Sequence, residues 1–131
     1  MAMLKLVLAL LLTVVSMSAQ AEWHSIYSDD NFSIYADSST ITRSGDLVKM
    51  WSLYDFKVAE AIPTSNPSQS QKTQKEFDCR TRKFRQLHMI LFSGNMGKGN
   101  AITTNDQTAD WMPFQRGSLN EIEWQTACGK N

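Results

Sequence analysis

Hydrophobic and polar positions alternate along much of the chain, and this pattern predicts a protein built mainly of short β-strands. In residues 32–36 the apolar side chains fall on one face and the polar ones on the other, as in a half-buried strand. Residues 23–28 are also rich in aromatic and β-branched types, and the Asp29-Asp30-Asn31 turn between the two runs predicts a hairpin. The polar patch at residues 37–40 is expected to interrupt the second strand.

The most apolar stretch after the amino-terminal leader covers residues 47–56. Bulky side chains lie on both of its faces, which predicts a central strand entered through a tight turn at Gly45. Residues 57–71 contain Pro63 and Pro67 among small polar residues, and we expect a mobile loop there.

The second half of the chain contains three more predicted strands. They cover residues 72–79, 84–92 and 101–104. A basic turn at residues 80–83 separates the first two, and a glycine-rich hairpin loop at residues 93–99 separates the last two. Alternation places Phe77 and Cys79 on the buried face of their strand.

The last predicted element is a helix with a clear start. Ser118 is a helix N-cap and Glu121, three residues later, completes a capping box, while Gly129 is the expected end. Its buried stripe is expected to comprise Leu119, Ile122, Trp124 and Cys128. The predicted fold is therefore α+β, a six-stranded antiparallel sheet with one C-terminal helix across a face.

Residues 1–21 are predicted to be a signal peptide. Lys5 precedes an apolar run of about ten residues, too short for the roughly 20 that span a bilayer, and the segment ends in Ala19-Gln20-Ala21. Cleavage is expected between Ala21 and Glu22, which leaves 131 − 21 = 110 residues, enough for a single domain at 22–131 without a transmembrane segment. The mature protein is thus expected to be exported, to the periplasm or to the outer cell surface of a bacterium.

The charge of the chain argues against nucleic acid as a partner, and its cysteine content predicts a disulfide. Loss of Lys5 leaves 13 − 1 = 12 basic against 13 acidic residues, so no global charge attracts nucleic acid. Two cysteines in an oxidising compartment predict one disulfide, Cys79–Cys128, that tethers the helix to the sheet. Their separation of 128 − 79 = 49 residues corresponds to roughly 4 kcal/mol on the chain-entropy model.

The sequence contains little that suggests catalysis. Its only histidines are His24 and His88, and both cysteines are expected to be in the disulfide, so we predict a protein that is not an enzyme and needs no cofactor. A basic cluster is formed by Arg80, Arg82, Lys83 and Arg85. It has two interpretations, cross-strand pairing with nearby acidic residues and a contact surface for an anionic ligand such as a sulfated glycan.

The expected mature start, Glu22-Trp23-His24, also has two interpretations. A free amine with histidine in third place can bind Cu(II) or Ni(II) through the amine, two backbone amides and the imidazole. Alternatively, these residues begin a paired strand whose amides are already used.

Residues spread over most of the mature chain resemble the surface-adhesin protein E family of exported bacterial proteins. The matching residues are Trp23, Tyr27, Ser28, Arg43-Ser44-Gly45-Asp46, Val48, Trp51, Leu53, Glu76-Phe77-Asp78-Cys79, Phe92, Ser93-Gly94, Met96-Gly97, Gly99, Trp111, Pro113, Gly117-Ser118, Glu121 and Cys128. One departure is Arg116 before Gly117, where a proline is expected.

The resemblance implies a six-stranded antiparallel sheet with a helix tethered by a disulfide, in agreement with the pattern analysis. It also implies a non-enzymatic binding module, with adhesion to host or extracellular-matrix proteins as the family label. A protein partner is expected, and a homodimer is left open. Candidate binding surfaces are the sheet edges, residues 57–71 and the hairpin at residues 94–99. The alternative function is a periplasmic structural or envelope-associated protein.

Overall fold

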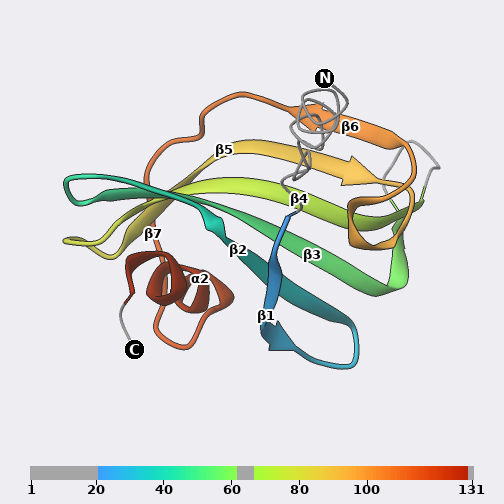
Figure 1. The fold of residues 1–131 in the computed structure, drawn as a ribbon, viewed down its shortest axis with the longest axis horizontal. Coiled ribbons are helices and arrows are strands. Elements are labelled where there is room, and N and C mark those ends of the chain that lie inside the picture. The colour runs from blue at the N-terminus through green and yellow to red at the C-terminus, as the bar shows by residue number, and fades with distance from the viewer. Residues whose placement is uncertain (1–20, 62–66, 130–131) are drawn as a thin grey trace, which may run out of the picture.

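The computed structural model describes residues 21–61 and 67–129, so the predicted leader lies outside the described residues except for Ala21. The strands are β1 (Trp23–Ser28), β2 (Phe32–Ser44), β3 (Leu47–Ala61), β4 (Pro67–Asp78), β5 (Lys83–Phe92), β6 (Ala101–Asn105) and β7 (Met112–Pro113). A short 3-10 helix, η1 (Asn95–Gly97), follows β5, and the helix α2 (Leu119–Cys128) ends the fold (Figure 1).

The sheet is antiparallel, and its order β1-β2-β3-β4-β5-β6 follows the chain. This confirms the predicted six-stranded sheet. A seventh strand, β7, pairs with the start of β5 through Met112 and Pro113. Two residues, one of them a proline, are too few for an alternating pattern, so the sequence did not predict β7.

The polar patch at residues 37–40 does not interrupt β2, and that prediction was wrong. The strand continues to Ser44, with a shift of register between Asp37 and Thr42. Within the shift the Thr40 hydroxyl accepts a hydrogen bond from the Trp51 amide at 3.1 Å. A side-chain oxygen therefore takes the place of a backbone carbonyl, which allows the two strands to stay together through the bulge.

Most of the segment predicted as a mobile loop is strand instead. β3 extends to Ala61 and β4 begins at Pro67, so the prediction for residues 57–71 was wrong except at 62–66, which lie outside the described residues. Pro67 opens its strand, where a missing amide is tolerated. Ser70 is fully buried and donates to the Gly94 carbonyl at 2.6 Å. The small hydroxyl residues thus fill a buried part of the sheet.

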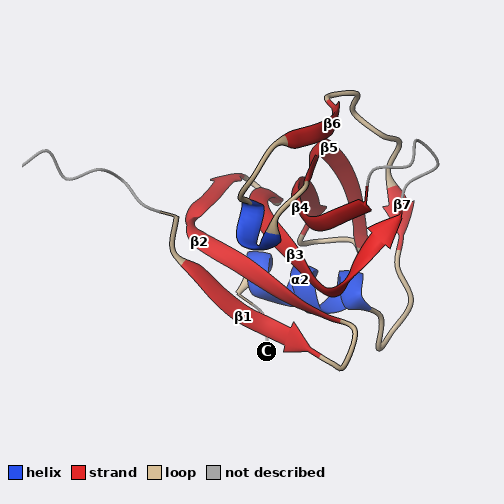
Figure 2. Cartoon of the chain, turned by 90° about the vertical axis from the view of Figure 1, so that its right-hand side faces the viewer, coloured by secondary structure: helices blue, strands red, loops and turns tan. Residues whose placement is uncertain are grey.

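Helix α2 packs against one face of the sheet, near the disulfide (Figure 2). The buried core there consists of Ala36, Val48, Met50, Phe77, Cys79, Trp124, Ala127 and Cys128. The Cys79–Cys128 bond is present, with a Cα–Cα distance of 5.6 Å, and the Trp124 indole donates to the Asp78 carbonyl at 2.8 Å. The predicted tether between helix and sheet is confirmed.

The predicted start and end of the helix are also confirmed. The Ser118 hydroxyl accepts from the Glu121 amide at 3.3 Å, and the Glu121 carboxylate accepts from the Gly117 amide at 3.2 Å. Gly129 ends the helix in the left-handed conformation, with φ 69°. The predicted buried stripe was wrong in part, because Leu119 and Ile122 are only half-buried.

The buried face of the helix includes a charged residue that the predicted stripe did not contain. The helix buries Glu123 completely, and the Glu123 carboxylate accepts from Lys75 Nζ and from the Tyr54 hydroxyl, each at 2.7 Å. Lys75 Nζ also lies 3.1 Å from the Asn120 side-chain oxygen. Burial, reinforced by the negative charge of Glu123, raises the pKa of Tyr54 far above its usual value.

Candidate functional site

The face of the sheet opposite α2 carries a concentration of aromatic side chains. Alternation decides which residues face this way, because Met50 and Ser52 of β3 are fully buried on the helix side and Trp51 between them points to the other side. One row of paired residues crosses five strands on this open face. It consists of Trp23, Asp37, Trp51, Gln74 and His88.

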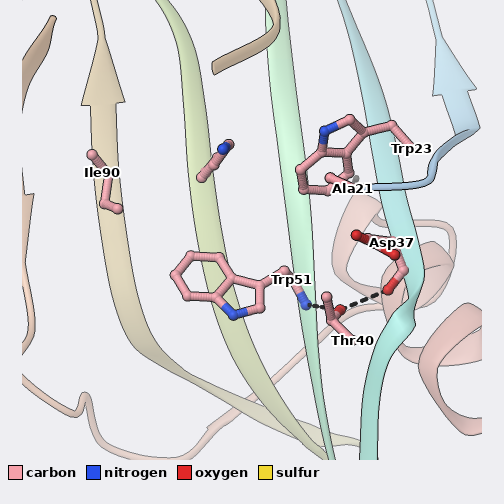
Figure 3. A pocket seen from close by; sticks show the side chains of 7 residues that line it. Ala21, Trp23, Asp37, Thr40, Trp51 and Ile90 are labelled. Carbon is pink, nitrogen blue, oxygen red and sulfur yellow. Dashed lines mark hydrogen bonds between the residues drawn. The ribbon is translucent and has the colours of Figure 1, made fainter. Parts of the chain in front are cut away.

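The open face is hollowed between this row and the next one. The hollow has a volume of about 290 Å³, and we call it the tryptophan groove. Its lining residues are Ala21, Trp23, Asp37, Thr40, Trp51, Lys72 and Ile90. Figure 3 shows Trp23 and Trp51 on different strands, with Asp37 and Thr40 on the strand between Trp51 and the edge, and Ile90 on a strand at the other side.

Lys72 supplies the positive charge of the groove. Its Nζ lies 5.9 Å from the ring centre of Trp23 and 5.3 Å from that of Phe92, within cation–π range. In the part of the chain that the structure describes, no ion pair reaches Lys72. Gly97 of η1 lies close to the same side chain. A Cβ atom in place of the glycine hydrogen would lie 2.5 Å from Lys72 Cε.

His88 belongs to this face and is half-exposed. Its ring stacks on Trp51 with centroids 6.1 Å apart, and Nδ1 lies 3.0 Å from an Asp106 carboxylate oxygen. Trp51 is therefore held between its strand neighbours and a stacked imidazole. This arrangement favours a fixed aromatic platform over a mobile side chain.

The basic cluster is largely engaged within the protein. Arg85 forms an ion pair with Glu76, its partner across β4 and β5, and lies over the Trp111 ring at 4.5 Å. Arg82 pairs with Glu121 and lies over the Trp124 ring at 5.1 Å. The basic cluster had two interpretations, cross-strand pairing and an anionic contact surface. At Arg85 the structure contains the first, a cross-strand pair with Glu76.

The expected mature start lies at the edge of the sheet. Trp23 pairs with Asp37 and the next residue, His24, with Ala36, so consecutive residues of β1 point to opposite faces. The Glu22 amide donates to the Asp37 carboxylate at 3.3 Å. Copper or nickel binding would have to free this nitrogen and disrupt the first ladder pairs, and it stays an untested hypothesis.

The described residues contain no group of three or more histidine, cysteine or acidic side chains that could hold a metal ion. They also contain no helix both long and apolar enough to cross a membrane. Both cysteines are in the disulfide.

Comparison with known families identifies the chain. A model of surface-adhesin protein E matches residues 23–129. The chain belongs to the surface-adhesin protein E family. The match covers the whole described sheet and α2, and it agrees with the resemblance noted in the sequence. A search of curated proteins finds no match.

Solved structures of Haemophilus influenzae protein E have the same fold as this family member. Crystal form II of that protein is 12% identical with a TM-score of 0.61, covering 85% of this chain and 97% of the other. Protein E from non-typeable Haemophilus influenzae is 13% identical with a TM-score of 0.61, covering 86% and 79%. At such low identity the likeness establishes the fold alone.

The sequence did not predict the groove of this adhesin-family chain. Trp23 was noted as a family residue and as part of the expected mature start, Trp51 as a family residue in the predicted central strand, and Lys72 as the start of a strand. Three strands bring these residues together, so their proximity depends on a register that the sequence leaves open. Of the surfaces expected to bind a partner, the edge strand β1 lines the groove through Trp23, and Gly97 of the hairpin at residues 94–99 lies against Lys72.

Proposed function

We propose that this protein is an exported, non-enzymatic binding module that holds a protein partner in the tryptophan groove on the open face of its sheet. The observation that carries the proposal is the pair of tryptophans beside a lysine that has no carboxylate partner among the described residues. Membership of the surface-adhesin protein E family supports a binding role over a catalytic one.

The size of the groove favours a side chain of a partner protein over a cofactor. About 290 Å³ is just below the roughly 300–1,000 Å³ that small-molecule pockets occupy. Tryptophan is among the residues that contribute most to protein interfaces, because it buries a large rigid surface at a small entropy loss. The half-buried rings of Trp23 and Trp51 offer such a surface.

The charge of the groove defines the chemistry of the partner. Lys72 is positive, while the Asp37 carboxylate is buried and already accepts hydrogen bonds from Ser39. A partner segment with a carboxylate next to an aromatic or aliphatic side chain would satisfy Lys72 and cover the two rings together. We therefore propose an acidic, partly apolar segment as the occupant.

Binding of the mature protein to a panel of immobilised extracellular-matrix and serum proteins tests this proposal. We expect Lys72→Glu to weaken binding to any positive panel member at least tenfold, because the introduced carboxylate repels the acidic segment. Trp51→Ala should weaken the same interaction by a similar factor. Circular dichroism should show that both variants keep the fold.

The matched control is Lys83→Glu, which makes the same charge change at an exposed lysine of the basic turn. We expect it to bind like the unmodified protein. Loss of binding in Lys83→Glu, with Lys72→Glu unaffected, would assign the contact to the basic cluster and contradict the groove. A panel with no positive member would contradict the host-binding part of the proposal.

The cellular location separates this function from the alternative, a periplasmic structural or envelope-associated protein. We propose an outer-surface location, supported by the surface-adhesin family. Protease added to intact cells should digest the native protein. Protection until the outer membrane is opened would contradict the surface location and favour a periplasmic partner.

A further inference from the structure

Asp37 is a buried carboxylate without a cation beside it. Its exposed fraction is 2%, and among the described residues no lysine, arginine or histidine forms an ion pair with it. Oδ1 accepts from the Ser39 amide at 3.0 Å and from the Ser39 hydroxyl at 2.5 Å. An ionised group so far out of solvent is costly unless an opposite charge accompanies it.

The other oxygen of Asp37 faces the backbone where the mature chain is expected to begin. Oδ2 lies 3.3 Å from the Glu22 nitrogen, which in the uncleaved chain is a neutral amide. The register of β1 and β2 sets this contact. Because Trp23 pairs with Asp37, the backbone nitrogen of the preceding residue, Glu22, lies beside the Asp37 carboxylate. Glu22 is also the residue that follows the expected cleavage point.

Hydrolysis of the Ala21–Glu22 bond would change the charge at this nitrogen. One water is consumed, Ala21 leaves with a carboxylate, and Glu22 keeps an amine whose ordinary pKa of about 8 makes it an ammonium at neutral pH. We propose that cleavage after Ala21 completes an ion pair between the new α-ammonium of Glu22, an exposed residue, and the buried Asp37 carboxylate. The pair would fasten β1, the edge strand, at its first residue.

The proposal makes the position of cleavage matter for the folded protein. A start one residue earlier would put the charge at Ala21 and leave an amide facing Asp37. It would also keep Ala21 at the rim of the tryptophan groove, which Ala21 lines in the uncleaved chain. The ion pair does not depend on the proposed binding function, and its test uses no ligand.

Thermal unfolding of four proteins tests the ion pair. These are the chain starting at Glu22, the same chain with its α-amine acetylated during chemical synthesis, and both forms carrying Asp37→Asn. Acetylation should lower the unfolding midpoint of the chain with Asp37 by about 4 °C, the shift that a loss of about 1 kcal/mol in unfolding free energy produces in a domain of about this size. In the Asp37→Asn pair, acetylation should have no effect, since no carboxylate remains to bind the ammonium.

A chain with one alanine added before Glu22 keeps a free amine but displaces it, and it should lose stability as acetylation does. Asp30→Asn, at an exposed aspartate, is the control that should leave the effect of acetylation unchanged. Equal midpoints with and without acetylation in the presence of Asp37 would overturn the proposal, as would an equal loss in the Asp37→Asn pair. Amino-terminal sequencing of the exported protein should find Glu22 first, and any other first residue would also overturn it.

Discussion

Tyr54, Lys75 and Glu123 form a cluster of buried polar side chains that holds the helix to the sheet. Lys75 Nζ lies 2.7 Å from the Glu123 carboxylate and 3.0 Å from the Tyr54 hydroxyl. Loss of Lys75 or Glu123 leaves the opposite charge buried without its ion-pair partner, which costs more than the interaction itself contributes. These side chains therefore fix where α2 lies on the sheet.

The cluster predicts a loss of stability in alkaline solution. Because the pKa of Tyr54 is raised on folding, its contribution is complete below the unfolded pKa of about 10 and declines as the pH rises above it. The unfolding free energy should fall by about 1.4 kcal/mol for each pH unit above 10 through this residue. Urea unfolding at pH 9 to 11 measures it.

The Tyr54→Phe variant should have an unfolding free energy about 1 kcal/mol lower at pH 7. Its unfolding free energy should no longer show the additional decrease above pH 10 that Tyr54 causes. Tyr27→Phe is the control. The pKa of Tyr27 is also raised, chiefly by its hydrogen bond to Asp29, but its ring is near solvent and the slope should change less. Equal slopes for Tyr54→Phe and the unmodified protein would refute the prediction.

Among the elements, α2 depends most on a covalent link. It is ten residues long, too short to be stable alone, and the sheet must supply its stability. The Cys79–Cys128 bond joins its last residue to the residue directly after β4, and the Trp124 indole donates a hydrogen bond to the carbonyl of Asp78, the last residue of β4. The bond thus holds the carboxyl-terminal end of a short helix against the buried core.

Replacement of both cysteines by serine should lower the unfolding free energy by roughly 4 kcal/mol, since the link spans 49 residues. The variant should still fold at room temperature, because its apolar core remains. Urea denaturation of both proteins measures the difference. Reduced unmodified protein is the control and should lose about as much; a loss below about 1 kcal/mol in either would show that the link contributes little.

At this scale most of the fold could be predicted, and the failures have a physical cause. Alternation located the strands around Ile34, Trp51 and Phe77, and Ser118 with Glu121 located the helix start. The errors fell on the polar segments 37–40 and 57–71, where hydroxyl and carboxylate side chains complete the sheet's hydrogen bonds. Composition alone cannot separate such polar strands from loops, because the difference depends on which groups pair.

In the whole molecule, each of the strands β1 to β6 pairs with its neighbour in the chain. The central strands β3 and β4 are paired on both sides for most of their length, while β6 has only β5. Residues at the sheet centre, Val48, Leu53 and Thr73 among them, are fully buried. Stability should therefore decrease from the middle of the sheet to the β6 side.

Hydrogen exchange followed by mass spectrometry should show this gradient. Amides of β3 and β4 around Ser52 and Thr73 should exchange slowest, at rates set by global unfolding, and those of β6 should exchange at least a hundredfold faster. Peptides from β1 give an internal comparison, because that edge strand also contacts α2. Equal protection in β6 and β3 would contradict the gradient.

The tryptophan groove, our proposed binding site, is formed by several strands together, which is why sequence analysis missed it. Trp23, Trp51 and Lys72 lie on three strands, and only the register of β1 to β4 places them around one hollow. Charge and motif searches favour residues that are close in sequence, such as the basic cluster at 80–85. In the fold Arg82 and Arg85 of that cluster are paired with acidic side chains.

The strand order has a consequence for how the molecule is made. A ribosome delivers the chain from its amino terminus, and here every new strand from β2 to β6 finds its partner already synthesised. The helix and Cys128 arrive last. Oxidation to Cys79 can therefore close only after nearly the whole domain has emerged, so the appearance of that bond in newly made protein reports the completion of assembly.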